Sequence, residues 1–320
     1  MRIRLIGALT AAFLATSFVG TATAAAPPSL TAPPPLTATA SLTAPPPAAL
    51  SSSTSIPVAT SAAAAAAAPS ITAKRAYVVD ATTGKALTAK SSTSRVQIAS
   101  VTKLMTAYVV LQRAKLTDVV TITKADIQWA ASHGATGGGF KAGEKFYVRD
   151  LLYALLLPSA ADAASALATK YGSGKTKFVA RMNDAAKKLG LKDTRYANAD
   201  GLTSTVSYST ARDQVTLARA VLKNPTLATI VKTGRRTVAA TKVHRKHTWT
   251  NTNKLLGEGA IGLKTGYTAK AGYCLAFAQV KNGHTIVGVV LGDKGDTARF
   301  TSARRLLSWA GAQVKAAAAV

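Results

Sequence analysis

The chain has 320 residues and a formal net charge of +27, because 40 lysines and arginines face only 13 acidic residues. Hydrophobic residues make up 48% of the chain, which is enough for a core and excludes a wholly disordered protein. One cysteine excludes a disulfide framework and every cysteine-rich metal site, and four scattered histidines make a histidine-based zinc site unexpected.

Residues 1–24 have the pattern of a secretory signal peptide. Arg2 and Arg4 precede an uncharged apolar stretch, and Ala-Thr-Ala at 22–24 fits a small-residue cleavage site. An uncleaved N-terminal membrane anchor is the alternative, although the apolar run is short for a membrane span. We therefore expect a secreted protein that meets little nucleic acid but can meet anionic polymers.

The next segment, residues 25–73, consists of Ala, Pro, Ser and Thr with almost nothing else and has no charged or aromatic residue. This composition cannot bury a core and predicts a disordered, partly polyproline-like linker. Residues 74–320 are then expected to form one folded unit.

Within this unit, strand and helix patterns alternate. The sequence predicts a hairpin over 77–87, a helix over 100–113, and a final hairpin over 273–291 with an Asn-Gly turn. Between and after them, apolar periodicity and capping residues predict helices over 150–157, 159–170, 178–189, 210–223 and 297–312. Strands at both ends with helices between them indicate an α+β fold whose two ends share one sheet.

Ser100 and Lys103 form the only S-x-x-K in the chain. Residues three apart share one face of a helix, so the lysine amine can lie beside the serine hydroxyl. A lysine whose pKa is lowered by burial or by another cation can accept the serine proton, and the helix start favours developing negative charge. The alternative for Ser100 is an ordinary helix cap.

Two further short motifs are candidates. Lys264-Thr265-Gly266 precedes Tyr267 and the final hairpin, and suits a substrate carboxylate, with the glycine allowing a close backbone approach. A second copy, Lys232-Thr233-Gly234, is followed by two arginines and no clear hairpin, so we prefer the later copy. Ser159 follows Pro158 at a helix start, and its alternative is an N-cap.

The order of these motifs resembles the S-x-x-K, S-x-N and K-T-G order of serine β-lactamases and penicillin-binding proteins. The chain is most similar to the secreted D-alanyl-D-alanine carboxypeptidases, the low-molecular-mass penicillin-binding proteins, from about Lys74 to Ala310. The matching stretches are residues 98–107, 148–159, 198–202, 208–213 and 262–268. The resemblance implies an antiparallel sheet flanked by helices, an all-helical lobe, and a site in the cleft between them.

The resemblance also implies roles for single residues. Ser100 would attack the carbonyl between the last two D-alanines of a peptidoglycan stem peptide, and Lys103 would accept its proton. Ser159 would relay a proton to the leaving amine. Water would then release the acyl-enzyme, and β-lactams would be inhibitors because they acylate the same serine.

The remaining implied residues bind substrate. Lys264 and Thr265, with Gly266 beside them, would hold the terminal carboxylate. The backbone N–H groups of Ser100 and Tyr267 would form the oxyanion hole. No cofactor and no metal are implied, the protein is expected to be a monomer, and the cell wall is the expected location.

One position departs from the family pattern. The residue two after Ser159 is Ala161 where the family usually has Asn, and no S-x-N occurs elsewhere. Ala161 removes a polar contact to the substrate amide, which predicts slower acylation, and leaves open how Lys103 is oriented.

Three rival functions follow. A β-lactamase needs a glutamate after the second motif, and the only two glutamates, Glu144 and Glu258, are not placed for that role. A non-catalytic wall-binding protein would keep the fold without cleavage. A transpeptidase would differ only in passing the acyl group to an amine instead of water, which the sequence does not decide.

Overall fold

The computed structural model describes residues 66–318, with side-chain surroundings described to Val314. The predicted signal peptide and the part of the predicted linker before residue 66 lie outside the described residues. Residues 71–73, at the end of that linker, pack in the structure, since Ile71 and Ala73 are buried. No helix within the described residues is long and apolar enough to span a membrane.

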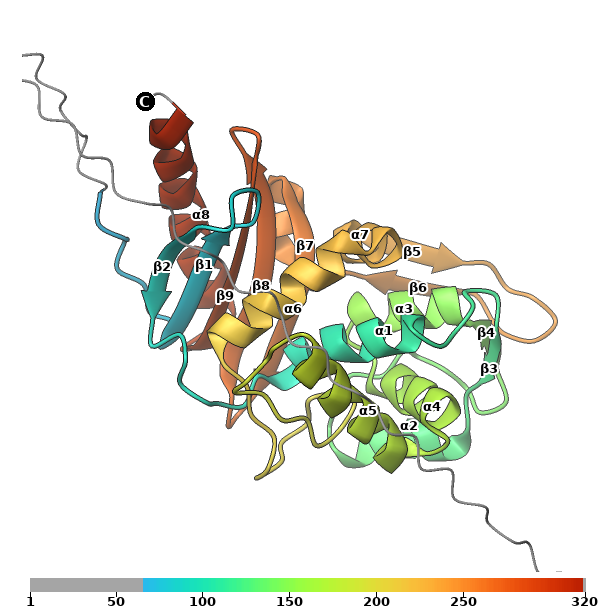
Figure 1. Ribbon diagram of the computed structural model, residues 1–320. Coiled ribbons are helices and arrows are strands. Elements are labelled where there is room, and N and C mark those ends of the chain that lie inside the picture. The colour runs from blue at the N-terminus through green and yellow to red at the C-terminus, as the bar shows by residue number, and fades with distance from the viewer. Residues whose placement is uncertain (1–65, 319–320) are drawn as a thin grey trace, which may run out of the picture. The chain divides into compact units, whose positions relative to one another are not determined.

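A five-stranded antiparallel sheet forms the centre of one half of the molecule (Figure 1). Its strand order is β2-β1-β9-β8-β7, so both ends of the folded unit contribute to one sheet, as the sequence predicted. The strands are β1 (Arg75–Asp80), β2 (Ala86–Lys90), β7 (Ala260–Thr268), β8 (Gly272–Lys281) and β9 (His284–Asp293). Because β7 ends the order, one of its edges has no neighbouring strand among residues 66–318.

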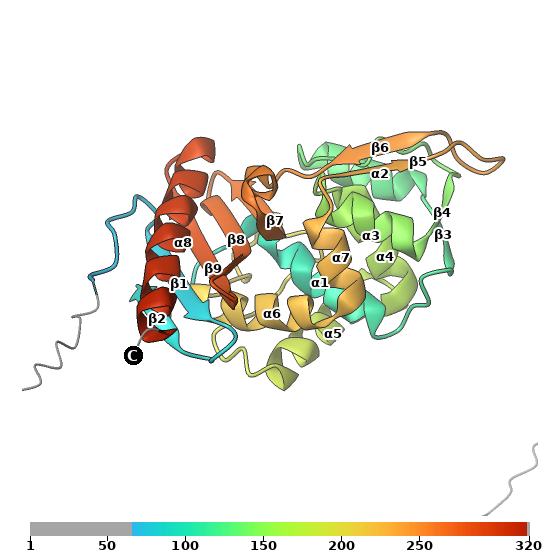
Figure 2. The same ribbon diagram turned by 90° about the horizontal axis from the view of Figure 1, so that it is seen from above.

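Helices cover both faces of this sheet (Figure 2). The long helix α8 (Asp296–Ala318) packs on one face, where Phe277 of β8 and Phe300 of α8 belong to one buried cluster. Helix α6 (Ala211–Lys223) packs on the other face against β1 and β9. Thr210 accepts a hydrogen bond from the Asp213 N–H and caps α6, as its sequence predicted.

The second half is the helical lobe that the family resemblance implied. It is built from η1 (Ala99–Thr102), α1 (Lys103–Leu111), α2 (Lys124–Ser132), α3 (Val148–Leu156), α4 (Ala161–Gly172) and α5 (Lys175–Lys188). Its apolar side chains belong to one continuous core that also reaches the inner face of the sheet. The lobe also carries two small sheets, β3 (Val119–Thr121) with β4 (Lys145–Tyr147), and β5 (Arg235–Val238) with β6 (His247–Thr250).

Two connecting elements join the halves. Helix α7 (Pro225–Lys232) packs between β7 and α3, and the short η2 (Lys254–Glu258) leads into β7. The sequence predicted a helix end before Asn224-Pro225 but not the new helix. Asn224 accepts a hydrogen bond from the Leu227 N–H, and Pro225 occupies the first turn, which are ordinary signals for a helix start.

Candidate active site

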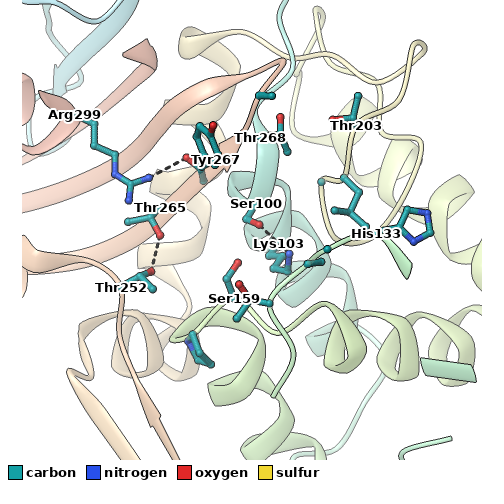
Figure 3. A pocket seen from close by; sticks show the side chains of 18 residues that line it. Ser100, Lys103, His133, Ser159, Thr203, Thr252, Thr265, Tyr267, Thr268 and Arg299 are labelled. Carbon is teal, nitrogen blue, oxygen red and sulfur yellow. Dashed lines mark hydrogen bonds between the residues drawn. The ribbon is translucent and has the colours of Figure 1, made fainter. Parts of the chain in front are cut away.

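A pocket of about 570 Å³ lies between β7 and the helical lobe (Figure 3). Its walls come from η1 and α1, the loops after α2 and before α4, the 201–203 loop, β7 and α8. Six of the seven site residues predicted from the sequence line it: Ser100, Lys103, Ser159, Thr265, Gly266 and Tyr267. The structure thus brings together three motifs that span more than half of the chain.

Ser100 and Lys103 form the centre of the pocket. Lys103 Nζ lies 3.0 Å from Ser100 Oγ and 2.6 Å from the backbone oxygen of Asp200. Lys103 is only 2% exposed, and burial lowers its pKa to about 8, although the negative charges of Asp200 and Asp162 oppose this shift. A neutral amine is therefore accessible near neutral pH, as a proton acceptor requires. Ser100 makes no capping hydrogen bond, so the alternative of an ordinary helix cap is wrong.

Lys264 is the predicted residue that does not line the pocket. It is 1% exposed, and its ammonium donates to the backbone oxygen of Thr265 at 3.1 Å. Burial, together with the positive charges of Lys103 and Arg299, lowers its pKa well below the usual value. The positive charge of Lys103 thus helps to lower the pKa of Lys264, while the lowered pKa of Lys103 comes from burial.

Ser159 lines the same pocket as Ser100 and Lys103, from the loop before α4 (Figure 3). Its φ of 76° is in the left-handed region, and its buried Oγ has no hydrogen-bond partner within the described residues. The N-cap of α4 is Ala160, without a side-chain bond, so the alternative of an N-cap for Ser159 is wrong. A hydroxyl group without a hydrogen-bond partner remains free to donate or accept a proton.

A polar wall faces the other side of Ser100. Thr265 Oγ1 lies 2.5 Å from Thr252 Oγ1, and Arg299 donates to the backbone oxygen of Gly266 at 3.0 Å. Sequence reasoning missed Thr252 and Arg299, which belong to no local motif. Arg299 is 7% exposed and forms an ion pair with Asp296, yet it reaches the pocket from α8, so this wall combines hydroxyl groups with a buried guanidinium.

A close backbone contact that the sequence did not suggest explains why residue 266 is a glycine. A Cβ at this position would lie 2.9 Å from the backbone oxygen of Ile98 and 3.0 Å from the backbone nitrogen of Ser100. The glycine therefore lets β7 approach the turn that carries Ser100. Next to it, Tyr267 is 53% exposed and its ring stacks on Tyr273.

Ala161, the departure from the family pattern, is fully buried and does not line the pocket. Its N–H donates to the backbone oxygen of Thr136 at 2.8 Å. The methyl group supplies no polar contact to Lys103, whose two partners within the described residues are Ser100 and Asp200. The orientation of Lys103 is thus provided by another segment.

The two glutamates and the second Lys-Thr-Gly, which the sequence analysis set aside, lie outside the pocket. Glu144 is buried beside Arg245 and His247, and Glu258 pairs with Arg304, so neither glutamate lines the pocket. Lys232-Thr233-Gly234 lies between the end of α7 and β5, also outside the pocket wall. Within residues 66–318, no group of three or more His, Cys, Asp or Glu side chains could hold a metal ion.

Comparison with known proteins gives a consistent result. Residues 62–295 match the D-alanyl-D-alanine carboxypeptidase family. A D-alanyl-D-alanine carboxypeptidase of Streptomyces sp. strain K15 is 39% identical over 255 residues, which cover 75% of this chain and 88% of the relative. The carboxypeptidase DacC of Escherichia coli K12 is 35% identical over 75% of this chain but only 62% of its own length, so this chain spans less than two thirds of it.

The fold has solved counterparts. The crystal structure of the Streptomyces K15 DD-transpeptidase matches 76% of this chain and 98% of its own, with a TM-score of 0.73 and 40% identity. The α+β fold with a helical lobe is therefore confirmed.

Proposed function

The chain belongs to the D-alanyl-D-alanine carboxypeptidase family, and from this premise we propose that it removes the terminal D-alanine of peptidoglycan stem peptides through an acyl-enzyme on Ser100. The observation that carries the proposal is the 3.0 Å approach of Lys103 Nζ to Ser100 Oγ in a pocket shared with the K-T-G strand. All residue roles below belong to this proposal.

Acylation begins at Ser100. Neutral Lys103 takes the hydroxyl proton while Ser100 Oγ bonds to the carbonyl carbon between the two D-alanines. The negative charge that develops on the carbonyl oxygen is held by the N–H groups of Ser100 and Tyr267. The C–N bond then breaks, and Ser159 relays the proton from Lys103 to the departing amine, which leaves both residues in their starting protonation states. Water attacks the ester, and the stem is released one D-alanine shorter.

The terminal carboxylate of the substrate fits the polar wall of the pocket. Thr265 and Thr252 present hydroxyl groups, and Arg299 adds a buried cation. Lys264 lies behind Thr265, where burial and the neighbouring cations lower its pKa and disfavour its charged form before substrate binds. A bound carboxylate favours the charged form of Lys264, so substrate binding and the proton balance of Lys103 are linked.

Transpeptidation is the second candidate, because the matched Streptomyces K15 structure is titled a DD-transpeptidase. The two reactions share the acyl-enzyme and differ in whether water or an amine accepts the acyl group. Chromatography of the peptide products with and without added glycine or D-amino acid separates them, since transfer yields a new peptide while hydrolysis yields only the shortened stem.

The test is D-alanine release from a D-Ala-D-Ala-terminated stem peptide by the full chain. We expect release by the wild type and none by Ser100→Ala, and a fluorescent penicillin should label only the wild type. Ser308→Ala is the matched control, because this serine is exposed on α8 outside the pocket. Peptide binding without release or labelling would refute the proposal and favour a non-catalytic wall-binding protein.

We extend the proposal to the protein's surroundings. It acts outside the cytoplasm, where peptidoglycan lies, as a monomer that β-lactams acylate, and its charge of +27 favours contact with anionic wall polymers. The signal-like residues 1–24 support export. Mass spectrometry of the protein from its own cells tests cleavage after residue 24, and an intact N-terminus would indicate the anchor instead.

A further inference from the structure

The amine of Lys103 donates a hydrogen bond to the 198–202 loop. Its hydrogen bond to the backbone oxygen of Asp200, at 2.6 Å, is shorter than its 3.0 Å approach to Ser100. A neutral amine has two N–H donors and one lone pair. Donating one N–H to a fixed carbonyl restricts the rotation of the amine, so that its lone pair can point at Ser100 Oγ.

Asp200 is itself fixed at both carboxylate oxygens. Oδ2 accepts a hydrogen bond from Trp129 Nε1 at 2.5 Å, and Oδ1 accepts one from the Leu202 N–H at 3.0 Å. Asp200 is 2% exposed, so these bonds are shielded from water. Trp129 lies on α2, and its hydrogen bond therefore links Asp200 to the helical lobe.

The carboxylate also contributes charge. The charged groups that face Lys103 are Asp200 from the loop, Asp162 from α4 and Lys264 from β7, and Arg299 of α8 acts in turn on Lys264. The negative charges of Asp200 and Asp162 raise the pKa of Lys103 against the effect of burial. The Asp162 carboxylate accepts hydrogen bonds from the Gly138 and Ala163 N–H groups and makes no hydrogen bond with Lys103.

We propose that Asp200, anchored by Trp129, is the positioning residue of the catalytic lysine, and that it supplies the orientation which Ala161 cannot. Its backbone oxygen aims the amine, and its carboxylate sets how readily that amine is protonated. The inference rests on the proposed function of Lys103 as proton acceptor.

Two variants separate orientation from charge. Asp200→Asn removes the charge and keeps one of the two acceptor oxygens, so the pKa of Lys103 should fall, and the acid limb of the penicillin acylation rate should move to lower pH by about half a unit or more. Trp129→Phe keeps the charge and removes the anchor. It should slow acylation several-fold at high pH, where the rate no longer changes, and leave the pH of the acid limb unchanged.

The measurement is the acylation rate of the full chain by a fluorescent penicillin between pH 5 and 10. Asp184→Asn is the matched control, because it removes an exposed carboxylate on α5 and should change neither feature. Competitive labelling of the Lys103 amine, read by mass spectrometry, gives the same titration without catalysis and covers a variant that acylates poorly.

The outcomes are distinct. A wild type that penicillin does not acylate contradicts the proposed function, while the labelling titration still tests the effect of Asp200. An acylated wild type whose Asp200→Asn titration and rate are unchanged overturns the inference. A purely structural role would lower the folded fraction of the variants, seen by circular dichroism, without moving the titration.

Discussion

Replacing Gly266 by alanine tests whether the approach of β7 to the nucleophile is as close as the structure indicates. The added Cβ would lie 2.9, 3.0 and 3.1 Å from Ile98 O, Ser100 N and Val101 N, where ordinary contact begins at 3.4 Å. All three atoms are backbone atoms, so no side chain can rotate away. The strand or the turn must therefore move by about half an ångström, at a cost of about 1–3 kcal/mol of folding stability.

A displacement of this size is large for catalysis. Active-site groups need to be held to within about 0.5 Å, and loss of one oxyanion donor typically slows a reaction about 10²–10³-fold. Gly266→Ala separates the Ser100 and Tyr267 N–H groups, so we expect acylation by penicillin to slow by at least about tenfold and as much as 10³-fold. Urea unfolding of the same sample measures the stability loss separately.

The chain contains its own control for this experiment. Gly234 ends the other Lys-Thr-Gly, has no left-handed φ, and a Cβ there would meet no atom within 4 Å. Gly234→Ala should leave acylation and stability unchanged. Wild-type acylation by Gly266→Ala, or equal damage from Gly234→Ala, would refute the argument from close approach.

Three further predictions concern charge. Because the pKa of Lys103 is about 8, acylation of Ser100 by penicillin should rise as pH increases through about 8 and then level off, and a flat profile from pH 5 to 9 would contradict Lys103 as the acceptor. Arg299→Leu should lower kcat/KM about tenfold or more for a stem peptide with a free carboxylate but little for its C-terminal amide; equal losses would exclude recognition of the carboxylate. Burial raises the pKa of Glu144, but hydrogen bonds from Arg245, Lys141 and His247 outweigh burial and lower the pKa to about 2. Ionised Glu144 therefore stabilises the fold above pH 4.5, and this stabilisation is lost as the pH falls toward 2. Glu144→Gln should cost about 2–3 kcal/mol in urea unfolding at pH 7, and the difference should vanish near pH 2.

Much of the fold could be predicted because its signals are local. The final hairpin follows from two apolar runs around Asn282-Gly283, and both turn residues have positive φ in the structure. The helix after Thr210 follows from a capping residue and apolar spacing. The small sheets did not follow, because strands of three or four residues, such as β3 and β5, carry too little alternation to be recognised.

The site could be predicted where a motif contributes several of its own residues. Ser100 with Lys103, and Thr265 with Gly266, are such pairs. Arg299, Thr252 and Asp200 each reach the pocket or its lysine from a separate segment, and nothing adjacent in sequence marks them. Their roles depend on tertiary packing over long separations, which a single sequence does not reveal.

The geometry around Ser100 explains why short motifs that are weak alone are specific together. A Cβ at Gly201 would collide with the backbone oxygen of Ala99, and a Cβ at Gly266 would crowd the nitrogen of Ser100, so two glycines enclose the same turn from two segments. Ala99 has a φ of 48°, a conformation that non-glycine residues keep only when their surroundings fix it. Each glycine is thus required because the backbone around Ser100 packs directly against it. The segments that carry Gly201 and Gly266 therefore both contact the turn that carries Ser100. A chance Lys-Thr-Gly such as the one ending at Gly234 has no such turn to enclose.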